Sequence, residues 1–476
     1  MNNIYIILVK SMIVLLFIFG VSCQKLDESP KGISTPANFY TTPAQCEAAF
    51  AASLNDLFEM WNWYENWWGL FPDGHHMSET LDYGANYGSE VWGVHFSSLK
   101  NVNLVLKSVK AGSLKGNPVD VINDIIGQAK FLRAFNYFTL VRLFGGVPYI
   151  TEDTPDPVSN PLTPADRLSI AEVYNMIEAD LEYAIDNLKD ESLVKPNSWG
   201  AKALLAKVYL TRATAPLNET TNYSKARDMA NDVIDNGPFS LINIEDVFPT
   251  WNKNNSEMIF CFQSTADDSR PDGIALSPSN YDGWNGGPVL DIWAETYPEQ
   301  PRKNNYLLTY MYTKLDWDSK ELVGPIIHYS ASLDKLPYMG KFNYPNISKE
   351  ELFGYANYNI PILRLADVML IYAEAANMAA SGPTQLAVDR LNMIIDRANA
   401  GVGLEARADI SMSQAVFDAK VIDERSYELC FEFDRVFDVF RKRLLEKAMD
   451  PEALVNYDIN DYLFPIPSFD AQFIGQ

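Results

Sequence analysis

The sequence predicts an all-α fold in which successive helices stack into a superhelix, interrupted by one loop-rich insertion with a few short strands. Apolar residues recur at intervals of three and four along most of residues 43–237 and 362–476, which is the spacing of one face of an α-helix. Residues 238–361 lack this spacing and are rich in Gly, Pro, Asn, Tyr and Trp, a composition that favours loops and short strands.

The expected helices have recognisable starts and ends. The first begins near Ala44, directly after Pro43, and proline is favoured in the first turn of a helix. The third stops at Gly145-Gly146, because glycine commonly ends helices. Its second half, Phe131–Phe144, is apolar nearly all round and is expected to be buried. The helices after the first are expected over Glu90–Val109, Val119–Phe144, Ile170–Leu188, Trp199–Ala215, Tyr223–Ile234 and Val416–Met449.

One pair of these helices matches the tetratricopeptide pattern. Ala206 and Tyr209 stand on its first helix at that repeat's offset, and Ala226, Ala230 and Val233 follow on its second helix. A weaker copy spans Arg364–Ala380 and Pro383–Ala398. Repeats of this type stack side by side and form binding surfaces, so we expect a tetratricopeptide-like superhelix.

The insertion offers one clear strand candidate, the apolar run Met258–Phe262. The chain is expected to return to long helices at Ile362. We therefore expect a single domain over residues 43–476, with a helical body at 43–237 and 362–476 and the insertion at 238–361.

Cys23 follows an apolar run, Met12–Val21, and the small residue Ser22, and a polar stretch comes directly after it. This junction predicts a bacterial lipoprotein signal peptide over residues 1–22, which is removed so that Cys23 is acylated as the new N-terminus. Residues 23–42 would then form the lipidated tether. An ordinary signal peptide or a membrane anchor is the alternative, but the apolar run is short for a bilayer-spanning helix.

The charge of the chain limits its partners. It carries 38 basic and 62 acidic side chains, a formal net charge of −24, and no cluster of Lys and Arg that would displace counterions from phosphates. We therefore expect no nucleic acid partner, and contact with a membrane through the lipid anchor only. Cys46, Cys261 and Cys430 are widely spaced and predict neither a disulfide framework nor a zinc site, but small buried side chains.

Residues typical of catalysis or of metal binding are sparse. The chain has four histidines, of which only His75 and His76 are adjacent, and we predict no metal site and no cofactor. The sequence contains no glycine-rich phosphate loop, no serine nucleophile elbow and no Cys-His arrangement. These observations indicate a binding protein rather than an enzyme.

Six groups of residues, in order along the chain, point to one family. The chain resembles the SusD/RagB family of Bacteroidetes outer-membrane nutrient-binding lipoproteins over essentially its whole length. It departs from the family pattern at Ser426, where a second Arg is frequent, and at Phe433, where Gly is frequent. The groups are Cys23 with Leu26-Asp27 and Pro30; Asn38-Phe39-Tyr40; Trp92 with Asn101 and Asn103; Phe131–Phe138 with Phe144–Pro148; Leu363–Val368 with Tyr372–Ala375; and Glu424–Leu429 with Arg435 and Pro465–Pro467.

Several charged residues in these motifs stand among apolar ones. A buried guanidinium without a carboxylate is very costly, so we expect ion pairs between helices. The arginines concerned are Arg133, Arg142, Arg364, Arg425 and Arg435. Their expected partners are Glu374, Glu424 and Glu428. A catalytic carboxylate pair is the alternative.

Two aromatic segments are the candidate ligand site. A pyranose presents CH groups on its face and hydroxyls around its rim, so flat rings beside polar side chains can hold it. One segment follows the first helix and the other lies in the insertion, the regions where family members build their ligand surface. The predicted ligand-binding residues are Trp67, Trp68, Asp73, His75, Tyr83, Tyr281, Trp284, Asn285 and Trp293.

The resemblance implies a lipid-anchored protein on the outer face of the outer membrane. It implies further that the protein captures an oligo- or polysaccharide and delivers it to a SusC-like TonB-dependent transporter. The same scaffold binding a peptide or another nutrient is the first alternative, and a glycan-processing enzyme is the second.

Overall fold

The computed structural model describes most of the chain. Residues Tyr40–Gln476 form one compact unit, to which the helices and strands named below belong. The described residues are 39–63, 87–155, 166–190, 193–264, 274–352, 356–432, 435–448 and 462–467.

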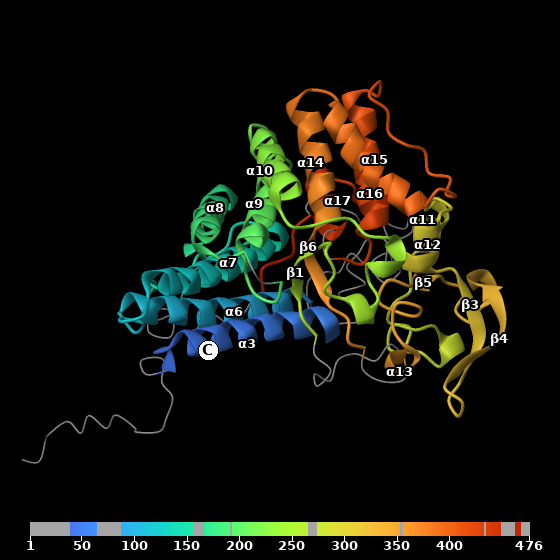
Figure 1. The fold of residues 1–476 in the computed structure, drawn as a ribbon, viewed down its shortest axis with the longest axis horizontal. Coiled ribbons are helices and arrows are strands. Elements are labelled where there is room, and N and C mark those ends of the chain that lie inside the picture. Colours follow the sequence, from blue (N-terminus) through green and yellow to red (C-terminus); the bar gives the residue numbers. More distant parts are fainter. Residues whose placement is uncertain are drawn as a thin grey trace, which may run out of the picture. The chain divides into compact units, whose positions relative to one another are not determined.

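The first three helices of this unit pack one on the next: α3 on α6, and α6 on α7 (Figure 1). Trp92 of α6 lies edge-on against Phe144 of α7, with 5.0 Å between ring centroids. The second half of α7 is buried at every position except Arg142, which confirms the expectation drawn from its apolar sequence. The bounds of these helices are α3 Pro43–Trp63, α6 Tyr87–Lys110 and α7 Val119–Phe144.

The next three helices, α8 (Ile170–Asn187), α9 (Ser198–Arg212) and α10 (Asn222–Asn236), continue the stack. Ser169 and Glu172 form a reciprocal capping box that satisfies backbone donors at the start of α8. The Asn197 side chain accepts a bond from the backbone N–H of Gly200 at 2.7 Å and starts α9.

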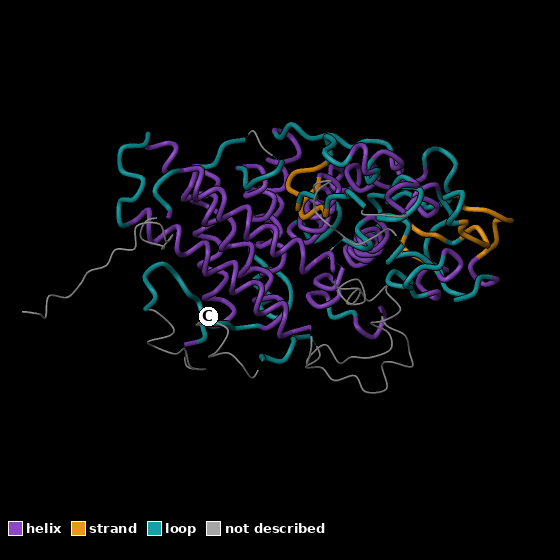
Figure 2. Tube along the Cα trace, turned by 90° about the horizontal axis from the view of Figure 1, so that it is seen from below, coloured by secondary structure: helices purple, strands orange, loops and turns teal. Residues whose placement is uncertain are grey.

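The insertion projects from between two helices that are neighbours in space. α10 packs directly against α14 (Leu365–Ala379), although the whole insertion separates them in the sequence. α14 in turn contacts α15 (Gln385–Asn399) and α16 (Gln414–Glu428). The stack of helices is therefore continuous across the insertion, and the predicted all-α, superhelical class is confirmed (Figures 1 and 2).

Within the described part of the insertion the strands form two-stranded antiparallel sheets. β1 pairs with β6, β2 with β5, and β3 with β4. The predicted strand Met258–Phe262 is β1. The predicted return to helix at Ile362 is wrong by three residues, because Ile362–Arg364 complete β6 against β1. The strands are β1 Met258–Phe262, β2 Leu307–Leu308, β3 Tyr310–Asp316, β4 Glu321–His328, β5 Tyr338–Met339 and β6 Ile360–Arg364, and the short helices are η2 Ile244–Asp246, η3 Thr250–Asn252, η4 Ser279–Tyr281, α11 Asp291–Thr296, α12 Pro301–Tyr306, η5 Tyr329–Ala331 and α13 Lys349–Leu352.

The predicted helix Val416–Met449 is wrong as a single element. It divides into α16, α17 (Arg435–Lys442) and α18 (Leu445–Ala448). The carbonyl oxygens of Glu428 and Cys430 accept bonds from Lys341 Nζ at 2.9 and 2.8 Å. Phe431 then adopts a left-handed backbone with φ of 61°. Side chains from distant segments thus take carbonyls that a continuous helix would use, and the local apolar pattern does not reveal this.

No helix in the described part of the chain has the length and apolar character needed to cross a bilayer. Cys46, Cys261 and Cys430 are buried free thiols, as their isolated spacing predicts.

Candidate functional site

The aromatic segment of the insertion is a loop that folds back on itself. The backbone N–H of Trp284 donates to the carbonyl of Ile274 at 3.2 Å, and that of Gly286 donates to Ala275 at 2.8 Å. At the tip, Asp282 directly follows η4, and its backbone N–H donates to the carbonyl of Ser279. Because these backbone groups are paired within the loop, its tip has a defined shape before any ligand arrives.

The backbone of this loop needs particular residues at three positions. Asp282 and Asn285 have φ of 55° and 59°, in the left-handed region that Asp and Asn tolerate better than other non-glycine residues. A Cβ atom on Gly283 would collide with the carbonyl oxygen of Ser277. Asp282, Gly283 and Asn285 are therefore each suited to the backbone conformation or the space at their position in this turn.

A group of side chains, here called the Asn285 clamp, holds the base of the loop. Asn285 Oδ1 lies 3.0 Å from Ser279 Oγ and 2.9 Å from the hydroxyl of Tyr338. Asp334 accepts from the backbone N–H of Ser279 at 2.8 Å and lies 2.9 Å from the same Tyr338 hydroxyl. Burial, together with Asp334, raises the pKa of Tyr338, so its hydroxyl remains a donor. Asn285 is thus a residue that shapes the loop.

Tyr281 lies beneath the loop rather than on it. Its side chain is 1% exposed, and its hydroxyl accepts from the backbone N–H of Tyr312 in β3 at 3.1 Å. A ring so deeply buried offers no face for stacking, which corrects its predicted role as a ligand contact. Tyr281 instead joins the loop to the β3–β4 hairpin.

Two exposed indole rings belong to this region: that of Trp284, two residues after Asp282 in the loop, and that of Trp317, which bonds to Asp282. Trp284 is 61% exposed, and Trp317, in the turn between β3 and β4, is 48% exposed. Trp317 Nε1 donates to Asp282 Oδ2 at 2.8 Å, which fixes the hairpin turn against the loop. Asp282, Trp284 and Trp317 are called the tryptophan platform below. It offers flat apolar faces beside a solvent-exposed carboxylate.

The structure places the remaining predicted residues elsewhere. Trp293, on α11, is half-buried and packs edge-on against Tyr297 and Phe431, at centroid distances of 5.5 and 6.2 Å. Its role as a ligand contact stays a prediction. Another set of predicted residues lies outside the described part of the chain, and their roles also stay predictions: Cys23, Trp67, Trp68, Asp73, His75 and Tyr83.

Trp317 is the platform residue that the sequence prediction missed. It stands between Asp316 and Asp318 in a polar turn that joins the two segments forming β3 and β4. A large aromatic residue within such a turn has little chance of burial, and that signal could have identified it. Asp282 was inside the predicted aromatic segment but was not singled out.

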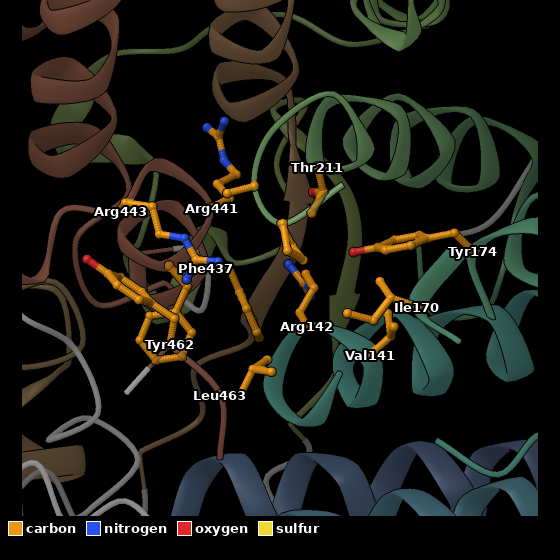
Figure 3. Close-up of a pocket in the computed structure, with 13 residues that line it drawn as sticks. Val141, Arg142, Ile170, Tyr174, Thr211, Phe437, Arg441, Arg443, Tyr462 and Leu463 are labelled. Carbon is orange, nitrogen blue, oxygen red and sulfur yellow. The ribbon is translucent and has the colours of Figure 1, made fainter. Parts of the chain in front are cut away.

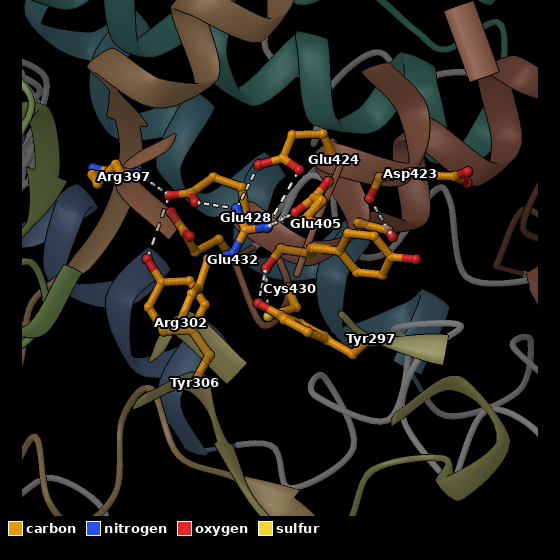
Figure 4. A network of polar contacts seen from close by, with 12 residues as sticks. Tyr297, Arg302, Tyr306, Arg397, Glu405, Asp423, Glu424, Glu428, Cys430 and Glu432 are labelled. Carbon is orange, nitrogen blue, oxygen red and sulfur yellow. Dashed lines mark hydrogen bonds and ion pairs between the residues drawn. The ribbon is translucent and has the colours of Figure 1, made fainter. Parts of the chain in front are cut away.

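The buried charges form a separate network around Glu424 and Glu428 of α16 (Figure 4). Arg302, Arg364 and Arg397 all contact the Glu428 carboxylate. Arg364, one of the arginines expected to be paired, contacts Glu428, one of the expected carboxylates, with 2.8 Å between Nη1 and Oε1. Three guanidinium groups around one carboxylate hold the pKa of Glu428 well below its usual range, against the opposing effect of burial.

Glu424 behaves differently in the same network. Burial raises its pKa to about 8, with Arg302 opposing and Glu405 adding to the rise. Glu424, Glu428 and Arg302 are all 0% exposed at their side chains, so solvent and substrate have no direct access to them. The arrangement connects α12 to α16 and is structural in character.

Other predicted ion pairs exist but with different partners. Arg133 contacts Asp180 at 2.6 Å, and Arg425 contacts Asp367 at 2.9 Å. Glu374, the third expected partner, pairs with Arg441 at 2.6 Å. The expectation of buried pairs between elements is therefore confirmed, while the choice of carboxylate depended on contacts that sequence order does not give.

Comparisons with known proteins agree with this architecture. Residues 22–210 match the family model described as "Starch-binding associating with outer membrane", and residues 325–471 match the one described as "SusD family". A SusD-like protein P2 of Formosa agariphila is 28% identical, with 96% of each chain covered. A SusD-like protein of Bacteroides ovatus is 27% identical over 92% of this chain and 82% of its own.

Solved structures share the fold. A SusD superfamily protein from Bacteroides vulgatus has a TM-score of 0.74 at 17% identity, covering 91% of this chain and 98% of its own. One from Parabacteroides distasonis has a TM-score of 0.73 at 23% identity, covering 90% and 97%. With these matches along its length and the stacked helices around a loop-rich insertion, the chain belongs to the SusD/RagB family.

Proposed function

We propose that this protein binds an oligo- or polysaccharide at the tryptophan platform and passes it to a SusC-like TonB-dependent transporter of the outer membrane. The observation that carries the proposal is the exposed indole of Trp317 bonded to the exposed Asp282 carboxylate, with a second exposed indole, Trp284, two residues further along the same loop. An indole face matches the CH face of a pyranose, and a carboxylate accepts bonds from its hydroxyls.

Asp282 has acceptor capacity to spare. Its Oδ2 accepts from Trp317, and the residue is exposed, so the other oxygen can accept from a ligand hydroxyl. The negative charge of this residue, in a chain of net charge −24, disfavours a sulfated or uronic acid glycan. We therefore propose a neutral glycan as the substrate class.

A sharp test compares exposed tryptophans on and off the platform. The double variant Trp284→Ala/Trp317→Ala is titrated calorimetrically against a panel of neutral polysaccharides that the unaltered protein binds. Binding should weaken by at least about tenfold, since each stacking ring contributes on the order of 1 kcal/mol beyond area burial. Trp251, 69% exposed in η3, supplies the matched control Trp251→Ala, which should bind normally.

Equal binding by the double variant and the control would refute the platform as the site. A second double variant, Trp68→Ala/Trp284→Ala, tests the predicted ligand segment after the first helix in the same experiment. It should also weaken binding. Thermal melting of all variants should match the unaltered protein, because Trp284 and Trp317 are substantially exposed.

The anchor and the transporter are part of the proposal. Cys23→Ala should abolish incorporation of labelled palmitate and release the protein from membranes, because the thiol is the acylation point. Gentle detergent extraction followed by affinity purification of the unaltered protein should recover a large β-barrel receptor. Recovery of the protein alone would contradict the delivery step.

The two alternatives have their own discriminating results. A peptide-binding protein of this scaffold would bind peptides from a protein digest and ignore the polysaccharide panel. A glycan-processing enzyme would release reducing ends from a bound polysaccharide. The carboxylates of the buried network do not favour the second alternative, because Glu424 and Glu428 have no exposed surface.

A further inference from the structure

A cavity of about 90 Å³ opens between α7, α8, α9 and α17 in the helical body (Figure 3). The cations in its wall are engaged within the protein. The Arg142 guanidinium lies against the rings of Phe138 and Phe437, and that of Arg441 contacts Glu374. We therefore assign no ligand to this cavity, and turn to the loop that joins α15 to α16.

This loop, residues 400–413, is called the strap below. Two asparagines of α15 hold its backbone. Asn399 Nδ2 donates to the carbonyl of Glu405 at 2.9 Å, and Asn399 Oδ1 accepts from the N–H of Glu405 at 3.1 Å. Asn392 makes the same pair of bonds with Ala408, at 3.0 and 2.8 Å. The strap is thus attached to α15 through polar contacts.

Little apolar burial supports the strap. Val402 is 75% exposed, Leu404 is 80% exposed and Ile410 is 47% exposed. A segment with few buried apolar contacts opens locally at a small cost in free energy, so its polar contacts decide whether it stays closed.

The side chain of Glu405 connects the strap to α16 and α12. Its Oε1 lies 2.8 Å from Lys420 Nζ, and its Oε2 lies 3.2 Å from Arg302 Nη2. The same Nη2 lies 3.3 Å from Glu424 Oε2, so one nitrogen of Arg302 contacts both carboxyl groups (Figure 4). The side chains of Glu405 and Glu424 are 4% and 0% exposed, so water does not separate their charges.

Glu405 and Glu424 are also hydrogen-bonded to each other. Ionised carboxylates are acceptors only, so a bond between the two requires a proton on one of them. Burial raises the pKa of Glu424 to about 8, with Arg302 opposing and Glu405 adding to the rise. Burial acts in the same direction on Glu405, but Arg302, Glu424 and Lys420 bring its pKa below the usual value. The proton therefore resides on Glu424, and the Glu405 carboxylate accepts from it.

Most of the groups that face this pair keep their charge between pH 6 and pH 9. Burial acts to lower the pKa of Arg302, but its carboxylate partners raise it well above the usual value, so Arg302 stays cationic. Glu428 stays ionised, as described above. Burial raises the pKa of Tyr427 to about 12 and that of Tyr297 well above 10, so both phenols stay neutral. The remaining group is Lys420, which contacts Glu405.

We propose that the strap is a pH-sensitive latch, in which a proton shared by Glu424 and Glu405 holds residues 400–409 against α16 and its loss in mildly alkaline medium loosens them. Two adjacent carboxylates without a proton repel each other in a desolvated site. Glu424 is fixed on α16 by Arg302, whereas Glu405 belongs to a loop, so the strap is the part that moves. Val402 and Leu404 move with it. The latch is independent of the glycan function.

The direction of the pH effect follows from Glu424. Because its pKa is raised in the closed state, the stabilisation of that state is fully present below about pH 4.5 and is lost as pH rises through 8. The test is hydrogen–deuterium exchange of the full-length protein in detergent at pH 6 and pH 9, with rates corrected for the intrinsic effect of pH. Protection of the amides of residues 400–409 should fall at least about tenfold, since one unit of pH across this window corresponds to a factor of ten. At pH 9 these amides should exchange at least about tenfold faster than those of α14.

Two variants that preserve the hydrogen bond test the shared proton. Glu424→Gln keeps a donor toward Glu405 but does not titrate, so protection of the strap should be the same at both pH values. Glu405→Gln donates to the ionised Glu424 and should also remove the pH dependence. Glu446→Gln, an exposed residue of α18, is the matched control and should lose protection as the unaltered protein does.

Three results would overturn the latch. The first is equal protection of the strap at pH 6 and pH 9 in the unaltered protein. The second is an equal fall in Glu424→Gln, which would assign the pH dependence to another group, such as Lys420. The third is equal protection of the strap and α14 at both pH values, which would mean that the strap opens only when the whole protein unfolds. Should Glu424→Gln fail to fold, Glu405→Gln decides alone.

Discussion

Arg364 and Asn285 each stand at the centre of a hydrogen-bonded network, one buried where the insertion meets the helical body and one within the insertion alone. Arg364 contacts the carboxylates of Glu257, Glu428 and Glu432 and is 1% exposed. Asn285 bonds to Ser279 and Tyr338 at the base of an exposed loop. The first network is charged throughout and sealed from water, and the second relies mainly on amide and hydroxyl groups beneath an exposed loop tip.

This difference separates the residues that identify the fold from those of the proposed ligand site. A buried charge network tolerates no missing member, because each removed partner leaves a desolvated charge. The loop is held mainly by neutral hydrogen bonds, and the loss of one of these costs less free energy than the loss of a partner of a buried charge. The tip of the loop can therefore carry exposed rings. The residues by which the chain resembles its family, including Arg364 and Glu428, accordingly lie in the first region, and Trp284 and Trp317 lie in the second.

The largest expected effect comes from breaking the charged network. Arg364→Met removes the cation shared by three buried carboxylates, so the free energy of unfolding should fall by about 3 to 5 kcal/mol. Chemical denaturation measures it. Arg407→Gln, which removes an exposed partner of Asp396, should cost less than about 1 kcal/mol. Similar losses in the two variants would contradict the contrast between buried and exposed charge.

Acid should weaken the helical body through His95. Burial lowers the pKa of this imidazole to about 4, from 6.5 for the free side chain, and its Nδ1 lies 2.7 Å from Asn136 Oδ1. Because the folded-state pKa is the lower one, the stability it contributes is fully present above about pH 6.5 and is lost as pH falls toward 4. The loss attributable to His95 should be about 3 kcal/mol.

The measurement compares denaturation at pH 7 and pH 4.5 for the unaltered protein and for His95→Gln, which keeps a donor but does not titrate. The variant should lose less stability over this range. Equal losses in both proteins would mean that carboxylates alone cause the acid sensitivity.

The sequence predicted the stacked helices well because their signal is local. The apolar stripes of α6, α7 and α9 mark them directly, and they pack as expected. The break after Glu428 could not be predicted, because it depends on Lys341 taking carbonyls from another segment. The candidate site was predicted only in part, because it too depends on a contact between segments that are distant in the sequence. Trp284 lies in a recognisably aromatic stretch, while Trp317 joins it only through the fold.

Gly283→Ala is expected to lower stability less than Arg364→Met does, but to have a strong effect on glycan binding. In Gly283→Ala the new Cβ meets the carbonyl of Ser277, so the tip of the loop must shift. Overpacking of this kind costs about 1 to 3 kcal/mol. Calorimetry with the glycan should show nearly complete loss of binding, because the shift displaces Trp284. Gly382→Ala, where a Cβ meets no atom within 4 Å, is the control and should bind normally.

The smallest effect on stability is expected for Asp282→Ala. This variant removes a side chain of the tryptophan platform and leaves the Asn285 clamp in place. The side chain is exposed, but Ala tolerates the left-handed backbone of this position less well than Asp does, so the free energy of unfolding should fall by about 1 kcal/mol. Glycan binding should nevertheless weaken about fivefold, because Trp317 loses the acceptor of its Nε1 and the ligand loses a hydroxyl partner. Asp318→Ala removes the same charge from the exposed turn beside Trp317 and should bind as the unaltered protein does. If both variants weaken binding equally, Asp282 acts only through its charge and the platform is not a set of positioned groups.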